Sequence, residues 1–477
     1  MTDLYATARQ MLADLEQRRV SARELLEAHV ARREKLHATI NAVVETDLDH
    51  AFEDAERIDA ARAKGEPLGR LAGLPMTIKD GYDVQGMPAT AGYPGYKDRS
   101  KNCSDAELVA RVRAAGAVVW GKTNVPIFLS DWQSYNDIYG TTNNPYDLTR
   151  VPGGSSGGAA AALASGMTPL EIGSDIGGSL RVPANFCGVC ALKPTWGVLP
   201  MRGHVPPPPG IDATADLGVG GPMARTIDDL KLLWSVLSGQ PERPRKTVKG
   251  LKLAVWDSDP LLPLGRDAKE AVARAADALA RQGAQVEAIA APVDTRELLI
   301  NYIWILSSII AAGFPESVLN EIGKTREADL KAFAGQRDPW SMAFNRLATT
   351  ARTDEVIAAQ RARQELKDRM AAFFQGYDAI LMPVAAVAAF NHDHSEPFYE
   401  RKLDVDGTDY PYRTMLGWIA IATALHLPAI VPPAGRAANG MPIGVQIVGP
   451  LNGEAGLLDI AAAVEESLGG FAAPSGM

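Results

Sequence analysis

The sequence predicts an α/β protein built on a mixed or parallel β-sheet, and two observations support this. Short apolar runs with strand character alternate with helical segments between residues 74 and 123. The same alternation returns after residue 251, where LKLAVW precedes an alanine-rich amphipathic segment and then AQVEAI. The chain has 477 residues, of which 46% are hydrophobic and 22% charged, a composition typical of a soluble globular protein. This length suffices for two ordinary domains or for one large core with insertions.

Helices are expected before the first strand. The helix that begins at SARE carries a capping box, because Ser21 can cap the helix backbone while Glu24 reaches back to the amide of Ser21. A charge-rich segment from about residue 47 to 64 predicts another helix. LPMTI, at residues 74–78, predicts a short buried strand that leads directly into Lys79.

A second capping box, at Ser104 and Glu107, predicts the start of the next helix, and AVVWGKT predicts the strand after it. Residues 290–376 read as mostly helical, whereas ILMP, AIVPP and PIGVQIVG predict strands before a closing alanine-rich helix. We therefore expect one domain over residues 1–477. Its parts are N-terminal helices (1–70), a core with serine- and glycine-rich segments (71–230), a helical insertion that shapes a pocket (290–376) and a return to the core sheet (377–477).

Charge and cysteine content exclude several classes of function. The formal net charge is −9 without a dense run of Lys and Arg, so we expect no nucleic-acid partner. Three cysteines cannot build a disulfide framework, which fits a reducing compartment. Cys187 and Cys190 form a CxxC pair, but the histidine cluster of His392 and His394 lies roughly 200 residues away, so we expect no metal.

Neither end of the chain nor its apolar segments predict a membrane partner. The start, MTDLYATARQML, lacks the basic residues and apolar core of a signal peptide. The most apolar stretch, residues 303–314, is too short to span a bilayer. The expected location is therefore cytoplasmic.

Two segments rich in glycine and serine carry the strongest functional signal: residues 151–162 (VPGGSSGGAAAA) and 173–183 (GSDIGGSLRVP). Neither matches the phosphate-binding patterns GxxxxGK[ST] or GxGxxG. Gly154, Ser156 and Gly158 match GxSxG, but a nucleophile elbow needs an apolar strand before its serine, and DLTRVPGG is polar and contains proline. We therefore favour neither a nucleotide site nor a nucleophile elbow.

The second segment suits acyl transfer. DIGGS can present the successive backbone amides of Ile176, Gly177, Gly178 and Ser179 to one point. Successive amides of this kind form an anion-binding nest, which suits the oxyanion of acyl transfer. Ser179 would then be both the nucleophile and the last donor of its own oxyanion hole.

A serine hydroxyl is a weak nucleophile and needs a base. Of the seven histidines, only His204 lies near either serine segment. A lysine can serve as the base if burial lowers its pKa enough for the neutral amine to persist. Lys79 follows an apolar run and is the candidate, although a salt bridge to Asp80 or to another carboxylate is the alternative interpretation.

Taken together, these segments resemble the amidase signature hydrolases. The similarity is dense from about residue 74 to 225, and its segments occur in the family's order: LPMTIKD, GKTN, TNNPYDLTRVPGGSSGG, GSDIGGS, PANFCGVCALKPTWG and GVGGPMARTIDDL. MPIGVQIVGP is a weaker C-terminal match. The resemblance implies the amidase signature fold, a central mixed β-sheet flanked by helices on both faces, and hydrolysis of amide C–N bonds.

The resemblance also implies a Ser–cis-Ser–Lys triad. Ser179 matches the nucleophile, Ser155 the bridging serine, whose peptide bond with Gly154 is expected to be cis, and Lys79 the base. In the implied mechanism, neutral Lys79 draws a proton from Ser155, which draws one from Ser179 as it attacks the carbonyl. Water then hydrolyses the acyl-enzyme, and no metal or other cofactor is required.

Further residues are expected to support the triad or to contact the substrate. We expect Ser156 to support its turn, Ser174 to hydrogen-bond near the bridging serine, and Asp175 and Arg181 to pair and hold the loops. Asn124 matches a position where some family members place an asparagine beside the substrate. Other candidates for the substrate site, each of which also suits the core, are Phe128, Leu129, Trp132, Tyr135, Tyr302 and Trp304.

The sequence indicates the substrate class less clearly than the type of chemistry. The glutamine-hydrolysing subunit of tRNA-dependent amidotransferases commonly carries Thr where this chain has Ile176, and its segment after KPT-aromatic-Gly usually differs from VLPMRGHVPPPPG. That segment looks more like stand-alone amidases acting on anilides, aryl amides or carbamates, such as aryl acylamidases and urethanases, with esterase side activity. We expect a small-molecule amide substrate and a monomer or homodimer. The alternatives are a non-catalytic binding protein with this fold and the amidotransferase subunit.

Overall fold

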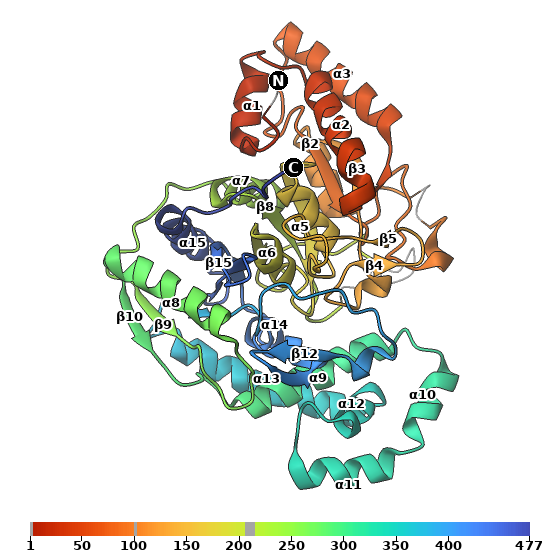
Figure 1. Ribbon diagram of the computed structural model, residues 1–477, viewed down its shortest axis with the longest axis vertical. Coiled ribbons are helices and arrows are strands. Elements are labelled where there is room, and N and C mark those ends of the chain that lie inside the picture. The colour runs from red at the N-terminus through yellow and green to blue at the C-terminus, as the bar shows by residue number, and fades with distance from the viewer. Residues whose placement is uncertain (1–2, 100–102, 206–214) are drawn as a thin grey trace.

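A single large mixed β-sheet organises the molecule (Figure 1). The computed structural model describes residues 3–99, 103–205 and 215–477, so the four prolines at 206–209 lie outside the described residues. Within these ranges the sheet has 11 strands, in the spatial order β1 (Val43–Thr46), β3 (Val118–Thr123), β2 (Pro75–Lys79), β6 (Leu170–Asp175), β8 (Val219–Ala224), β7 (Cys190–Lys193), β14 (Ala429–Val431), β17 (Gln446–Val448), β11 (Ala379–Met382), β9 (Lys252–Val255) and β10 (Gln285–Ala288).

The sheet is mixed, as the resemblance implies. Strands β2, β3 and β6 run parallel to one another, as do β9, β10 and β11, whereas β8, β7, β14 and β17 join these two groups through antiparallel pairs. Strands from both ends of the chain therefore share one sheet. Three two-stranded sheets lie outside it: β4 (Tyr135–Asn136) with β5 (Gly140–Thr141), β12 (Lys402–Val405) with β13 (Thr408–Pro411), and β15 (Pro433–Arg436) with β16 (Pro442–Gly444).

Helices flank the sheet. The N-terminal helices are α1 (Ala8–Glu16), α2 (Ala22–Ile40) and α3 (Leu48–Lys64), and the helices around the serine-rich segments are α4 (Glu107–Ala114), α5 (Gly157–Ala164), α6 (Arg181–Cys187) and α7 (Ile227–Ser238). The C-terminal half adds α8 (Arg266–Arg281), α14 (Ala420–Ala424) and α15 (Glu454–Leu468). Short 3-10 helices are η1 (Pro94–Tyr96), η2 (Ile127–Leu129), η3 (Phe398–Glu400) and η4 (Tyr412–Leu416).

Residues 290–376, expected to form a helical insertion, contain a mostly helical segment. It comprises α9 (Thr295–Ala311), α10 (Glu316–Gly323), α11 (Arg326–Gln336), α12 (Met342–Thr349) and α13 (Thr353–Phe373). Helix α9 packs against α12, α13 and α14, whereas α10 and α11 stand away from the main body at the lower right of Figure 1. Helices α9, α12 and α13 all contribute buried side chains to the core, among them Tyr302, Phe344 and Leu366.

The two expected capping boxes have opposite outcomes. The one at Ser21 is confirmed, since Glu24 N–H donates to Ser21 Oγ at 3.1 Å and Ser21 N–H donates to Glu24 Oε2 at 2.8 Å. The one at Ser104 is wrong, because α4 begins only at Glu107 and Ala106, at its N-cap, makes no side-chain hydrogen bond. The amide of Ala106 donates to the carbonyl of Asp83 at 2.8 Å, so a contact with a distant loop fixes the start of this helix.

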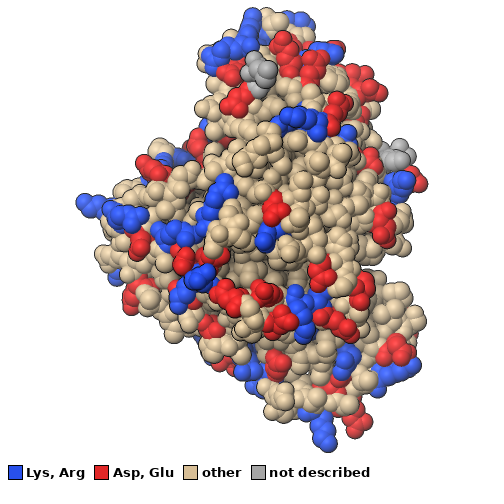
Figure 2. Space-filling view, in the orientation of Figure 1, with Lys and Arg blue, Asp and Glu red and all other residues tan. Residues whose placement is uncertain are grey.

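The surface carries charges of both signs. Lys and Arg are interspersed with Asp and Glu on the face in Figure 2, and large areas of that face carry no charge. Among the described residues, no helix is both long and apolar enough to cross a membrane.

Candidate active site

Lys79 ends strand β2 at the centre of a cluster of serine side chains. Its side chain is fully buried, and its Nζ lies 2.7 Å from Ser155 Oγ, 2.9 Å from Ser156 Oγ and 3.0 Å from Ser174 Oγ. The alternative interpretation of Lys79 as the partner of Asp80 is wrong. Asp80 instead pairs with Lys122 Nζ at 2.6 Å, and both of these side chains are fully buried.

The surroundings of Lys79 favour its neutral form. Burial lowers the pKa of Lys79 from 10.5 to about 7, against the opposing effect of the charges on Asp175 and Glu171. Burial also raises the pKa of Glu171 to about 8, although this carboxyl accepts a hydrogen bond from Thr77 Oγ1 at 2.8 Å. Near neutral pH, Glu171 is therefore mostly protonated, which leaves Asp175 as the main anion acting on the amine.

Ser155 lies in the loop that leads into helix α5. Its peptide bond with Gly154 is cis, as expected. Residue 154 has to be glycine, because a Cβ there would lie 2.3 Å from the carbonyl oxygen of Asp131. The loop is tied to the second segment by Ser156 N–H, which donates to the carbonyl of Ser179 at 3.2 Å. Ser156 thus contacts Lys79 itself, in addition to the supporting role expected of it.

Residues 176–179, the loop expected to form the oxyanion hole (the oxyanion loop), follow strand β6. This strand runs parallel to β2 and therefore ends at the same edge of the sheet. The expectation of four free amides is wrong for Gly178, whose N–H donates to Asp175 Oδ1 at 2.9 Å. The amides of Ile176, Gly177 and Ser179 donate to no other described residue, so three donors remain. Ser179 Oγ likewise makes no hydrogen bond within the described part of the chain, including to Ser155.

Asp175 and Arg181 form the expected pair. Arg181 Nη2 lies 2.9 Å from Asp175 Oδ1, and both side chains are fully buried. Burial alone would raise the pKa of Asp175, but the charge and hydrogen bonds of Arg181 outweigh it and lower this pKa to about 2. Arg181 also donates to Ile419 O, Gln446 Oε1 and Thr423 Oγ1, so it anchors the oxyanion loop to the C-terminal part of the core.

Two aromatic side chains hold the carbonyl side of the oxyanion loop. Trp132 Nε1 donates to Gly177 O at 2.7 Å, and the hydroxyl of Tyr302, from α9, donates to Ile176 O at 2.8 Å. The bond from Tyr302 fixes the peptide plane that carries the available amide of Gly177, whereas the bond from Trp132 fixes the plane of the Gly178 amide, which donates to Asp175. An apolar side chain faces the same loop, since Leu416 Cδ2 lies 3.7 Å from the position that a Cβ on Gly177 would occupy.

Asn124 is a correction to the expected substrate site. It is fully buried, and its Nδ2 donates to Gly140 O and Thr142 Oγ1, each at 3.0 Å. Its Oδ1 accepts from Val125 N at 3.0 Å and from Asn136 Nδ2 at 2.7 Å. These bonds use both ends of the amide, so Asn124 braces the β4–β5 hairpin and has no group left for a substrate.

Two of the remaining candidates are held mainly by other protein groups. Phe128 is 40% exposed and stacks on Tyr93, with 4.6 Å between ring centroids. Trp304 packs against Phe344 in the insertion. Leu129 lies near the triad strand, since its Cδ1 is 3.1 Å from the position of a Cβ on Gly81.

Tyr135 belongs to a charged cluster beside Trp132. Its hydroxyl accepts from Arg401 Nη2 at 2.7 Å, and Arg401 Nη1 lies 2.7 Å from Asp131 Oδ2. The side chains of Arg401 and Asp131 are only 1% and 7% exposed, so the two charges neutralise each other within the protein. This leaves neither charge of the pair unpaired to hold an ionic substrate.

His204 is the residue that motif reasoning missed. Its Nε2 lies 2.8 Å from Ser174 Oγ, the hydroxyl that also contacts Lys79. Ser174 Oγ meets the bridging serine through their shared contact with Lys79, and the backbone carbonyl of Ser174 also accepts from Ser156 Oγ at 3.3 Å. The available signal was that His204 is the one histidine close in sequence to either serine segment.

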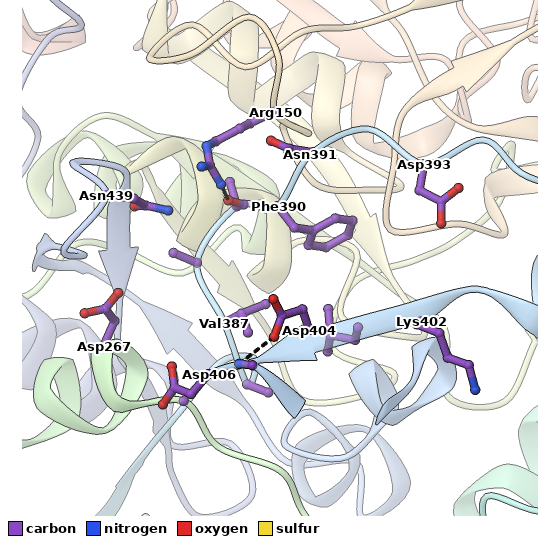
Figure 3. A pocket seen from close by; sticks show the side chains of 16 residues that line it. Arg150, Asp267, Val387, Phe390, Asn391, Asp393, Lys402, Asp404, Asp406 and Asn439 are labelled. Atoms are coloured by element: carbon purple, nitrogen blue, oxygen red, sulfur yellow. Dashed lines mark hydrogen bonds between the residues drawn. The ribbon is translucent and has the colours of Figure 1, made fainter. Parts of the chain in front are cut away.

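A cavity of about 500 Å³ lies apart from this cluster (Figure 3). Its lining includes Arg150, Asp267, Asp404 and Asp406, and none of the serine cluster or the oxyanion loop. Asp404 Oδ1 already accepts a hydrogen bond from Gly407 N–H at 2.7 Å, drawn as a dashed line in Figure 3. In the described ranges no three His, Cys, Asp or Glu side chains are grouped so as to hold a metal ion.

A buried lysine among serine hydroxyls, beside a loop of available amides, is the arrangement of a hydrolase that acts on acyl groups. A family model described as Amidase matches residues 24–458. The chain therefore belongs to the amidase family, whose members are amidohydrolases acting on C–N bonds.

Known relatives of this chain differ in their described activities. It is 32% identical over 475 residues to an acylamidase of Rhodococcus erythropolis, covering 93% of this chain and 91% of the relative. It is 31% identical over 491 residues to a glutamyl-tRNA(Gln) amidotransferase subunit of Synechococcus sp. (strain CC9605), covering 95% and 94%. The solved structure of a 6-aminohexanoate cyclic dimer hydrolase is similar with a TM-score of 0.80 and 27% identity, covering 100% of this chain and 99% of that one.

Proposed function

We propose that this protein hydrolyses small apolar or aryl amides through a Ser–cis-Ser–Lys triad and an acyl-enzyme. The observation that carries the proposal is the 2.7 Å contact between Ser155 Oγ and the fully buried Nζ of Lys79. Because burial lowers the pKa of Lys79 to about 7, a large fraction of the amine is neutral near pH 7 and can accept a proton.

The reaction begins when Lys79 takes a proton from Ser155 as Ser155 takes one from Ser179. Ser179 Oγ makes no hydrogen bond to another described residue, so we propose that its bond to Ser155 forms when substrate is bound. The carbonyl carbon then gains a bond to Ser179 Oγ, and its oxyanion accepts from the amides of Ile176, Gly177 and Ser179. The proton returns through Ser155 to the leaving nitrogen, and water hydrolyses the ester to Ser179 by the same relay.

The apolar substrate class follows from what surrounds the oxyanion loop. The side chain of Leu416 approaches it with apolar surface, while Asp131 and Arg401, the charged side chains beside Trp132, are paired with each other. Burying an ionic substrate without a counter-charge would be costly. Aryl carbamates and esters suit the same machinery, because their leaving groups are easier to expel.

Two alternatives give different outcomes in the same experiment. The sequence of this chain is 31% identical to the amidotransferase subunit and 32% identical to the acylamidase. This near equality supports glutamine hydrolysis as the second candidate function. A non-catalytic binding protein is the third, although an inactive relative would be expected to have lost a triad residue, and all three are present.

We propose to test these alternatives with an aryl anilide, an aliphatic amide, an aryl carbamate and glutamine as substrates. Ser179→Ala and Lys79→Ala should abolish hydrolysis. Their matched controls, Ser165→Ala at a buried serine outside the cluster and Lys249→Ala at an exposed lysine, should retain it. Activity on glutamine alone would favour the amidotransferase subunit, and full activity of Ser179→Ala would refute the triad.

We also propose a cytoplasmic enzyme that is a monomer or a homodimer. The three cysteines are free, which suits a reducing compartment. Light scattering on the purified chain measures the assembly directly, and a mass above that of a dimer would contradict the proposal.

A further inference from the structure

Lys79 is surrounded by three hydroxyls that compete for the same amine. Ser155, Ser156 and Ser174 all place Oγ within 3.0 Å of Lys79 Nζ. A neutral amine has two N–H donors and one lone pair. For the lone pair to accept the proton of Ser155, both other hydroxyls must accept hydrogen bonds from the amine and direct their own protons elsewhere.

The structure provides a hydrogen-bond acceptor for each of these two protons. Ser156 Oγ donates to the backbone carbonyl of Ser174 at 3.3 Å, which leaves its oxygen free to accept from Lys79. Ser174 Oγ lies 2.8 Å from His204 Nε2, which is the corresponding acceptor for the proton of Ser174. Without that acceptor, the hydroxyl of Ser174 can turn and donate to the lone pair of Lys79, which Ser155 requires.

The surroundings of His204 keep its ring neutral. The ring stands edge-on to Tyr82, with 4.8 Å between centroids. Burial, followed by the charges of Lys79 and Arg99, lowers the pKa of His204 to about 3. A neutral imidazole has one donor and one acceptor nitrogen, so a hydrogen bond from Ser174 to Nε2 requires the ring proton on Nδ1.

We propose that His204 is a positioning residue for catalysis: its Nε2 accepts the hydroxyl of Ser174 and so reserves the lone pair of Lys79 for Ser155. The inference rests on the triad of the proposed function. His204 touches no reacting atom, and it acts by selecting one of two hydrogen-bonding patterns around the amine.

Replacing His204 has a predictable effect on the charge of Lys79. The ionisable groups that face the amine are Glu171, Asp175 and His204, and those that face the His204 ring are Lys79, Arg99 and Tyr82. In His204→Leu, Ser174 no longer has an acceptor that turns its oxygen toward Lys79, so the ammonium form of Lys79 is less well stabilised. The neutral form of Lys79 gains Ser174 as a hydrogen-bond donor. The pKa of Lys79 therefore falls further in this variant, yet fewer of the neutral amines are paired productively with Ser155.

The test uses the full-length enzyme and two readouts between about pH 5 and about pH 9, a range that spans the folded-state pKa of Lys79. One readout is kcat and KM on an aryl anilide, and the other is the rate of covalent labelling by a fluorophosphonate probe, which needs an activated serine but no amide hydrolysis. His204→Leu should lower the plateau of both rates roughly fivefold to tenfold, the worth of about one hydrogen bond. It should also move the acid limb to lower pH and leave KM unchanged.

Two further variants separate positioning from a merely structural role. His204→Gln offers an acceptor oxygen at the place of Nε2 and should restore most of the rate and the pH profile. In a Ser174→Ala background, His204→Leu should change the labelling rate less than about twofold, because the hydroxyl through which it acts is gone. This comparison holds even if either single variant is less stable.

The outcomes distinguish this inference from the proposed function. An unchanged pH profile in His204→Leu, equal losses with and without Ser174, or a loss confined to KM would overturn the positioning role. Wild-type protein that is labelled but hydrolyses no amide would contradict the proposed function alone, since labelling still measures the effect of His204. Wild-type protein that is not labelled at all would overturn both.

Discussion

Replacing Lys79 with Met should abolish activity. The variant should also be more stable than the wild type at low pH and less stable than the wild type at high pH. The unfolded chain holds a proton on this amine below about 10.5, whereas the folded chain holds it only below about 7. Between these values the unfolded state binds more protons, so the stability of the wild type rises with pH. Across the whole window the shift corresponds to about 5 kcal/mol of unfolding free energy.

Methionine removes this pH-dependent term but leaves three hydroxyls without the amine. Each lost hydrogen bond costs about 1 kcal/mol, or about 3 kcal/mol for Ser155, Ser156 and Ser174 together. Lys79→Met should therefore be more stable than the wild type by about 2 kcal/mol below pH 7 and less stable by about 2 kcal/mol near pH 10.

The assay is urea unfolding followed by tryptophan fluorescence at several pH values. The quantity of interest is the difference in unfolding free energy between the two proteins, because titrating groups that do not interact with Lys79 cancel in it. Lys249→Met, at an exposed lysine, is the control and should show a nearly pH-independent difference. Parallel stability curves for the wild type and Lys79→Met would refute a buried amine with a lowered pKa.

Three further predictions follow from the same contacts. The kcat/KM of the wild type should rise with pH through about 7 and then level, because burial lowers the pKa of Lys79 to about 7 and only the neutral amine is a base; a rate that falls over this range would contradict it. Trp132→Phe removes the bond to Gly177 O and should lower kcat about tenfold in steady-state assays with little change in KM, whereas a change in KM alone would indicate a substrate contact. Asp175→Asn leaves Arg181 buried without its counter-charge and should destabilise the protein by about 3–5 kcal/mol in urea unfolding, and a loss below about 1 kcal/mol would disprove this role.

The residues of the proposed triad could be picked out from the sequence because they lie in short contiguous motifs with clear local structure. LPMTI is apolar enough to predict β2, and Lys79 falls at its last residue. Parallel strands β2 and β6 then bring Lys79 and Asp175 to one edge of the sheet. The capping box at Ser21 succeeded for the same reason, since both of its hydrogen bonds are local.

Features that depend on contacts between distant segments could not be read in this way. Ser104 resembles a helix cap, but the tertiary bond from Ala106 to Asp83 decides where the helix starts. Asn124 stands in a motif that implies a substrate contact, yet the hairpin that uses its amide lies further along the chain. His204 approaches Ser174 only once the sheet has formed, and no spacing in the sequence specifies that contact.

The central claim is that Ser179 carries the acyl group of the substrate while Lys79 and Ser155 move its proton. The most direct measurement is acid quenching during turnover of an aryl ester, followed by mass spectrometry of the intact protein and of its peptides. The account predicts one added acyl group, located on Ser179 and absent from Ser179→Ala. An acyl group on Ser155 or Ser156, or turnover of the ester without any covalent intermediate, would contradict it.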